Sequence, residues 1–285
     1  MAWRAISPNR RAIQLAKVQR VMTIADHLQE LRRRLYVSVA AVLMVAIVLF
    51  LDWRLLMRVI LLPVYAGGTF LRVHPGFPFV SWDWNLPLVG TASHQLLALS
   101  PLEPFFTVID VVLAASLIVT SPLWLYQLWA FFAPVLDRSK RRIVRELAIM
   151  AIILFVLGAA FAYLVVLPAA LQFLIQFGIG VFDVQFRASY YLGFVSTFLL
   201  AVGAVFDVPP ALLTLMALGV VTSQRLRRWR KYAVFAAGAV SAFVVPSQDP
   251  ISVGLVMLPI YLLYEISLWL APRFERRVNR SEANG

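Results

Sequence analysis

The segment Leu35–Leu51 reads L-Y-V-S-V-A-A-V-L-M-V-A-I-V-L-F-L and contains no charged residue along its 17 positions. As an α-helix it extends about 25 Å, close to the roughly 30 Å of hydrocarbon in a bilayer. Three arginines, Arg32–Arg34, directly precede it. This pattern predicts a membrane-spanning helix that starts beside a cluster of positive charge.

Five further apolar stretches follow, and with the first they predict an all-α, polytopic membrane protein with six transmembrane helices. Their expected bounds are Phe105–Leu136, Ile143–Ile175, Tyr190–Leu218, Tyr232–Val245 and Ser252–Leu270. The composition agrees, because 61% of the 285 residues are hydrophobic and only 14% are charged. The fifth stretch reaches only about 21 Å, so the bilayer is thinned there, or neighbouring helices cover it, or the helix is a few residues longer.

Positive charge gathers in alternate connecting segments. All but four of the 26 Lys and Arg residues lie in residues 1–34, Asp137–Arg145, Thr222–Lys231 and the segment from Pro272; the other four are Arg54, Arg58, Arg72 and Arg187. Cytoplasmic loops carry such an excess. We therefore expect these segments and both chain ends in the cytoplasm, and the chain in the cell inner (cytoplasmic) membrane. The net charge of +12 then reflects topology and contact with anionic membrane lipids, and no nucleic acid is expected as a partner.

Prolines within the spans predict kinked helices, whose freed carbonyl groups need other partners. They are Pro122, Pro168, Pro209, Pro210 and Pro259. The longest outer connector, residues 52–100, contains several glycine, proline and tryptophan residues, which predict an ordered outer cap. No internal repeat is found, and this disfavours a secondary transporter with two related halves.

Sequence patterns for catalysis or cofactor binding are missing. The sequence contains no cysteine, no H-E-x-x-H, no G-x-S-x-G and no Walker A loop. The three histidines, His27, His74 and His94, lack the spacing of metal ligands. We therefore expect neither enzyme activity nor a metal or cofactor, and an intramembrane enzyme would lack a nucleophile–base pair.

Acidic residues within the spans are candidates for function, because a carboxylate in lipid is costly. Asp207 in the fourth span and Glu265 in the sixth lie toward the cytoplasmic half, and Glu103 lies near the outer end of the second. Each either makes a structural bond, to a broken-helix backbone group or a neighbouring arginine, or has a role in the membrane. A proton-coupled small-molecule transporter that uses Asp207 and Glu265 is the alternative function.

A further candidate carboxylate, Glu30, precedes the first span. Thr23 with Asp26 resembles a capping box, and the apolar spacing that follows predicts a short amphipathic helix lying at the cytoplasmic interface. Glu30 then either pairs within this helix, with Arg33 or Arg34, or receives a cationic ligand. The residues alone leave both possibilities open.

Six short segments share their order and spacing with one protein family. They are H-L-Q-E-L-R-R-R-L at His27–Leu35, S-P-L-E-P-F-F at Ser100–Phe106, S-P-L-W-L-Y-Q-L-W-A-F-F-A-P at Ser121–Pro134, K-R-R at Lys140–Arg142, G-A-V-F-D-V-P at Gly203–Pro209, and the region Asp249–Glu265. From about Met22 to Ala271 the chain thus resembles the TatC family of twin-arginine protein translocases. The resemblance implies a six-helix membrane domain at residues 23–271 whose kinked helices form a concave receptor face. We expect residues 1–22 to be an unmatched basic extension, with a natural start at Met22 and no cleaved signal peptide, and residues 272–285 to be a basic cytoplasmic tail.

The resemblance implies a receptor that binds twin-arginine signal peptides of folded precursors at its cytoplasmic face. It implies an oligomeric complex with TatA-like and TatB-like single-span subunits, and export driven by the proton-motive force. The signal-binding acid of the family falls on Glu30, and a carboxylate can bind a guanidinium group through two hydrogen bonds.

The chain departs from the family in the first cytoplasmic loop. Lys140 stands where many members have a second glutamate. Asp137 or Glu146 is expected to take that role, and Asp137 is the preferred residue. Phe131 and Pro134 match the loop entry, where an aromatic residue helps to place the signal peptide or anchors the chain at the membrane interface.

The remaining family positions imply partner docking in the membrane. Asp207 matches an intramembrane acid that offers a polar site to a partner helix or to the apolar part of a signal peptide. Asp249 matches an acid in the outer turn before the last span, and Val253 replaces a polar residue often found four positions after it. Glu103 and Glu265 are further candidates for such docking.

Overall fold

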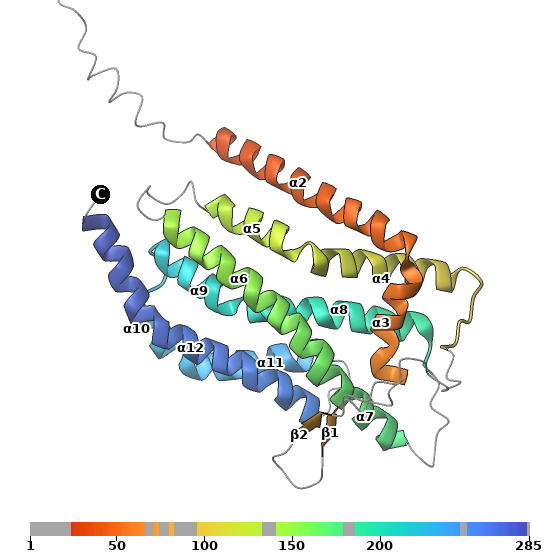
Figure 1. Ribbon diagram of the computed structural model, residues 1–285. Helices are drawn as coiled ribbons and strands as arrows, with labels where there is room; N and C mark the ends of the chain where they lie inside the picture. Colours follow the sequence, from red (N-terminus) through yellow and green to blue (C-terminus); the bar gives the residue numbers. More distant parts are fainter. Residues whose placement is uncertain are drawn as a thin grey trace, which may run out of the picture.

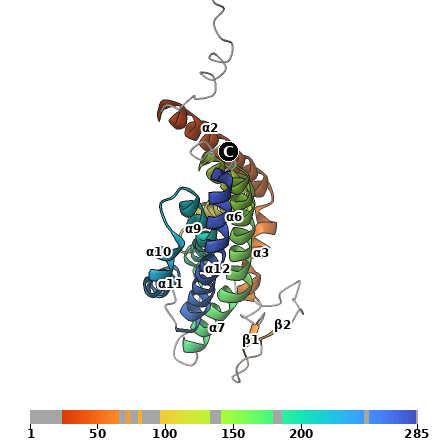
Figure 2. The ribbon, with the colours of Figure 1, turned by 90° about the vertical axis from the view of Figure 1, so that its left-hand side faces the viewer.

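The computed structural model describes residues 24–65, 71–73, 80–82, 96–132, 141–178, 186–245 and 250–283. Long helices lie side by side in a row, from α2 at one edge to α11 and α12 at the other (Figure 1). Turned by 90°, the same helices overlap in a narrower bundle, with α10 and α11 to one side of α12 (Figure 2). The all-α fold expected from the apolar stretches is confirmed, with only a small strand pair added.

Helix α2 (Ile24–Leu51) joins two segments that the sequence predicts as separate. No glycine or proline interrupts these 28 residues, so the amphipathic turns that carry Glu30 continue directly into the span. The prediction of a separate helix lying at the interface is therefore wrong. One side of α2 packs on α4 and α5.

The second predicted span is two helices, α4 (Glu103–Val119) and α5 (Ser121–Phe132), which meet at an angle of 59°. Pro122 lies in the first turn of α5, where it has no N–H to donate to the preceding turn. Side chains bond the carbonyl groups at the bend: Thr120 Oγ1 donates to Ser116 O at 2.6 Å, and Trp124 Nε1 donates to Leu117 O at 2.8 Å. The predicted kink is present.

Two other spans contain local breaks beside their prolines. Helix α6 (Arg141–Phe161) passes through a π-helical turn, η3 (Ala162–Val166), into α7 (Leu167–Gly178), and Pro168 follows the widened turn. Helix α8 (Ala188–Phe206) ends at Asp207, and α9 (Val208–Ala217) begins with the two prolines Pro209 and Pro210. Pro259, in contrast, lies within the unbroken helix α12 (Pro250–Ala283).

The fifth span is short. After α10 (Ser223–Arg228), helix α11 (Arg230–Val244) has 15 residues, which extend about 22 Å. It packs along α12, but Phe235 is 78% exposed and Phe243 is 90% exposed. Ala237 and Ser241 are buried, so neighbouring helices cover one side of α11 and leave these two rings uncovered. The three possibilities for this short span stay predictions.

Helix ends gather at two opposite ends of the molecule. The starts of α2 and α6, the end of α5, α10 and the end of α12 lie together at what we name the inner end, after its predicted orientation (Figure 1). The outer end contains α3 (Trp53–Tyr65), α7 and the antiparallel strands β1 (Leu71–Val73) and β2 (Val80–Trp82). The start of α2 and the end of α12 thus lie at the same end of the described structure (Figure 1).

Four helices in the described part of the chain are long and apolar enough to cross a membrane, or five if the bent pair α4–α5 is one span. The four run over Leu28–Leu51, Arg145–Leu171, Ala188–Ala217 and Ser252–Glu275. A count of six spans also requires α11, the predicted fifth span, which falls short of the length required. The six-span count and its orientation thus remain predictions.

Helices α6 and α8 pack closely against each other. Gly158 of α6 leaves room for Phe206 of α8, because a Cβ atom at position 158 would lie 2.6 Å from Cγ of that ring. In the same contact, Phe155 packs where Gly203 has no side chain. Both phenylalanines are buried, so this glycine–aromatic contact belongs to the core.

Candidate functional site

Glu30 lies near the start of α2, and its side chain is 23% exposed. Its Oε1 accepts hydrogen bonds from Nε and Nη2 of Arg34, one turn further on, at 3.0 and 2.5 Å. Arg34 also donates from Nη1 to Oε1 of Gln127 on α5, at 3.1 Å. Of the two possibilities for Glu30, the intrahelical pair is thus present, and it links α2 to α5.

The second carboxylate oxygen of Glu30 is different. Oε2 is buried and has no hydrogen-bond partner among the described residues. A buried, charged acceptor without a partner costs free energy, commonly 1–3 kcal/mol or more. Because Arg34 occupies only Oε1, the carboxylate retains the capacity to accept from a second cationic donor.

The other residues predicted for signal binding are only partly described. Phe131 lies near the end of α5, one turn beyond Gln127, and is half-buried. Glu146 lies in α6 and accepts from Arg142 Nε at 3.2 Å, in an exposed pair. Pro134, Asp137 and Lys140 lie outside the described residues, so the choice between Asp137 and Glu146 is untested.

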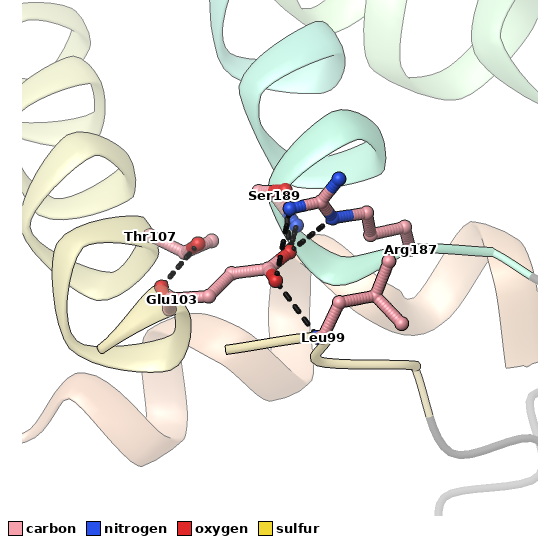
Figure 3. Close-up of polar contacts among 5 residues, drawn as sticks. All are labelled: Leu99, Glu103, Thr107, Arg187 and Ser189. Atoms are coloured by element: carbon pink, nitrogen blue, oxygen red, sulfur yellow. Dashed lines mark hydrogen bonds and ion pairs between the residues drawn. The ribbon is translucent and has the colours of Figure 1, made fainter. Parts of the chain in front are cut away.

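Glu103 starts α4 at the outer end, and its side chain is 6% exposed. Both of its oxygens are bonded (Figure 3). Oε1 accepts from Arg187 Nε at 2.8 Å, and from the hydroxyl and the more distant backbone N–H of Ser189. Oε2 accepts from Arg187 Nη2 at 3.2 Å and from the Leu99 backbone N–H at 2.9 Å.

Backbone bonds extend this outer clasp of Glu103, Arg187 and Ser189. The Leu97 N–H donates to Phe186 O at 3.0 Å, and the Ala188 N–H donates to Leu97 O at 2.9 Å. The hydrogen-bonded carboxylate of Glu103 also raises the pKa of Arg187. The clasp fastens the segment before α4 to the start of α8, so its contacts favour the structural alternative for Glu103.

Arg187 and Ser189 were not among the predicted site residues. Arg187 was visible in the sequence as one of four cations outside the basic segments, and a lone cation beside a span indicates an acidic partner. The sequence does not identify that partner, because Glu103 lies 84 residues earlier in the chain.

Asp207 lies at the break between α8 and α9. Its backbone continues the helical bonding, since its N–H donates to Ala204 O and its carbonyl accepts from Ala211 N. Its side chain caps no helix, and Oδ1 is buried without a hydrogen-bond partner among the described residues. The structural hydrogen bond considered for Asp207 is therefore not found there.

Glu265 of α12 has partners for both oxygens. Oε2 accepts from Arg230 Nη2 of α11 at 2.5 Å, and Oε1 accepts from the Tyr261 hydroxyl at 2.7 Å. This is the neighbouring arginine that the structural alternative requires. Asp249, which directly precedes α12 in the sequence, lies outside the described residues.

Known proteins resemble this chain over most of its length. Residues 26–259 match the family described as Sec-independent protein translocase protein (TatC). The chain belongs to the TatC family. It is 33% identical to the TatC protein of Aquifex aeolicus (strain VF5) over 258 residues, which cover 90% of this chain and 97% of that protein. It is 34% identical to the TatC protein of Escherichia coli (strain K12) over 254 residues, which cover 89% and 90% of the two chains.

Solved structures show the same family. A crystal structure of the twin arginine translocase receptor TatC in DDM is 33% identical and matches with a TM-score of 0.67, over 86% of this chain and 99% of that one. A second crystal structure of this receptor matches with the same TM-score at 32% identity. The chain is thus a multi-pass membrane component of the Tat protein translocase, and TatC is not a family of enzymes.

Proposed function

We propose that this TatC-family chain is the receptor subunit that binds twin-arginine signal peptides at the inner end. The unbonded Oε2 of Glu30 carries this proposal. In the free protein this oxygen has lost its contact with water and gained no hydrogen bond in return, which costs free energy. A hydrogen bond from a guanidinium group of the signal peptide would offset that cost. Lysine presents a single point charge, so an arginine pair would be preferred.

The remaining features of the proposal follow the family. The receptor lies in the cell inner membrane with six spans and both ends in the cytoplasm, and acts in an oligomer with TatA-like and TatB-like single-span subunits. Transport is driven by the proton-motive force. Phe131 and Pro134, with Asp137 or Glu146, place the signal peptide beside Glu30.

Docking of partners in the membrane was predicted for Asp207, Asp249, Glu265 and Glu103. This role is proposed for Asp207 and Asp249 only. Asp207 Oδ1 supports it, because a polar group from a partner helix would satisfy the buried oxygen. Glu103 and Glu265 are already bonded to Arg187 and Arg230. The bonds of Glu265 also count against the alternative of a proton-coupled transporter that uses this residue.

Photocross-linking tests the proposal. Membranes with the full chain receive a precursor whose signal peptide has R-R or K-K at its motif, in the wild type and in Glu30→Gln. A matched control is Glu275→Gln, on α12 at the same end. We expect strong cross-links only with R-R and with Glu30 present. Equal cross-linking by R-R and K-K would contradict the proposal, and unchanged R-R cross-linking in Glu30→Gln would move the site to Asp137 or Glu146.

A further inference from the structure

An apolar pocket of about 290 Å³ opens at the inner end, between α9, α10, α11 and α12. Leu212 of α9 and Leu226 of α10 form part of its lining, and Leu226 is fully buried. Three aromatic side chains complete much of its wall: Trp229, Tyr232 and Tyr264. Its size is near the lower end of ordinary small-molecule pockets, and its lining suits an apolar ligand.

The polar groups of the pocket are already satisfied or lie at its edge. Tyr264 donates its hydroxyl to Leu226 O at 2.6 Å, which leaves only its ring to the pocket. Trp229 is 47% exposed and Tyr232 is 61% exposed, and exposed rings of this kind lie at the headgroup level of a membrane. In the predicted orientation the pocket would extend from that level toward the hydrocarbon.

Positive charge is concentrated beside these rings. The segment Thr222–Lys231 contains five cations and no acid: Arg225, Arg227, Arg228, Arg230 and Lys231. Only Arg230 has an acidic partner among the described residues, Glu265. Lys231 places its Nζ 5.2 Å from the centre of the Tyr232 ring, which joins this charge directly to the pocket wall.

We propose that this inner pocket binds an anionic phospholipid. Part of one of its acyl chains occupies the pocket, and Lys231, together with Arg228 from the same basic segment, binds the headgroup phosphate. A free phosphate would leave the apolar lining empty, and a zwitterionic lipid would leave the surplus positive charge uncompensated. The combination of basic headgroup site and apolar pocket between membrane helices is the chemistry of an anionic lipid site. This inference does not depend on signal-peptide binding.

A photoreactive lipid provides the test. The full chain is reconstituted in phosphatidylethanolamine vesicles with a small fraction of phosphatidylglycerol that carries a diazirine on its acyl chain. We expect cross-links at Leu212 and Ala236 in the pocket lining. Arg228→Gln combined with Lys231→Gln should reduce them by about tenfold or more, since each cation near an anionic headgroup contributes roughly fivefold in affinity.

Three comparisons make the result specific. Ala236→Trp should block labelling by filling the pocket while all charges remain. The control Arg54→Gln with Arg58→Gln removes two exposed cations of α3 at the outer end, and labelling of the pocket should be unchanged. The same diazirine chain on phosphatidylethanolamine should label the pocket at least several-fold less.

Other outcomes would overturn the inference. Equal labelling by the two lipids, or unchanged labelling in the Arg228/Lys231 variant, would show that no anionic headgroup is recognised. Displacement of the lipid label by inorganic phosphate would assign the cations to a free anion. A photoreactive residue at position 236 that captures a protein chain and no lipid would assign the pocket to a protein partner. Signal-peptide cross-linking is measured in the same variants. It tests the receptor proposal separately, so a failure of lipid labelling is distinguished from a failure of signal-peptide binding.

Discussion

Two glutamates at opposite ends of the molecule differ in how completely they are bonded. Glu103 at the outer end directs both oxygens to donors from Arg187, Ser189 and Leu99. Glu30 at the inner end directs one oxygen to Arg34 and leaves the other buried without a partner among the described residues. We propose from this difference that Glu103 stabilises the fold, whereas the spare buried acceptor of Glu30 serves to bind a ligand.

The largest effect on stability is expected at the outer clasp. Glu103→Ala leaves Arg187 beside the buried start of α4 without its carboxylate, and removes the acceptor for Ser189 and Leu99. The midpoint of thermal unfolding in detergent should fall by roughly 5 °C. The double variant Glu103→Gln with Arg187→Gln should recover part of this loss. An unchanged unfolding midpoint in Glu103→Ala would show that the bonds of Glu103 do not stabilise the fold, and would contradict the contrast drawn with Glu30.

An intermediate effect on stability is expected at the contact between α6 and α8. Gly158→Ala places a Cβ atom 2.6 Å from Phe206 Cγ, which neither buried helix can easily accommodate. Overpacking of this kind costs about 1–3 kcal/mol. The unfolding midpoint should fall, and Gly193→Ala in α8, whose Cβ atom would meet no neighbour within 4 Å, is the matched control. Equal midpoints for the two variants would contradict the packing described for this contact.

The smallest effect on stability is expected for Glu146. Its pair with Arg142 is exposed, so Glu146→Gln should change the free energy of unfolding by less than about 0.5 kcal/mol. Signal-peptide cross-linking in the same variant sharpens the assignment at the inner end. Loss of cross-linking with unchanged stability would select Glu146 over Asp137 as the second acid, whereas retained cross-linking keeps Asp137 as the preferred residue.

Local patterns predicted much of the fold. The apolar stretches Ile143–Ile175 and Tyr190–Leu218 correspond to the helical segments Arg141–Gly178 and Ala188–Ala217 within a few residues. Proline positions predicted the bend at α4–α5 and the break at Asp207. The continuous helix α2 was not predicted, because its amphipathic and apolar segments suit different environments and therefore indicate separate helices. Nothing in the backbone of these segments requires a break between them.

The candidate site was predictable only where its contacts are local. Arg34 is four residues from Glu30, so helix geometry alone indicates that pair. Gln127, which bonds to Arg34, is 93 residues away and has no sequence signal that identifies it. The same holds for Arg187 and Glu103, because partners from distant segments depend on how the helices pack.

The central claim is that Glu30 binds the arginines of a signal peptide, and a double-mutant cycle tests it most directly. The dissociation constants of R-R and K-K signal peptides are measured for the purified wild type and for Glu30→Gln. We predict that the R-R peptide loses about tenfold or more in affinity with Glu30→Gln, while the K-K peptide loses far less, which gives a coupling of about 1 kcal/mol or more. Equal losses for both peptides, or none, would contradict the assignment of Glu30 as the arginine contact.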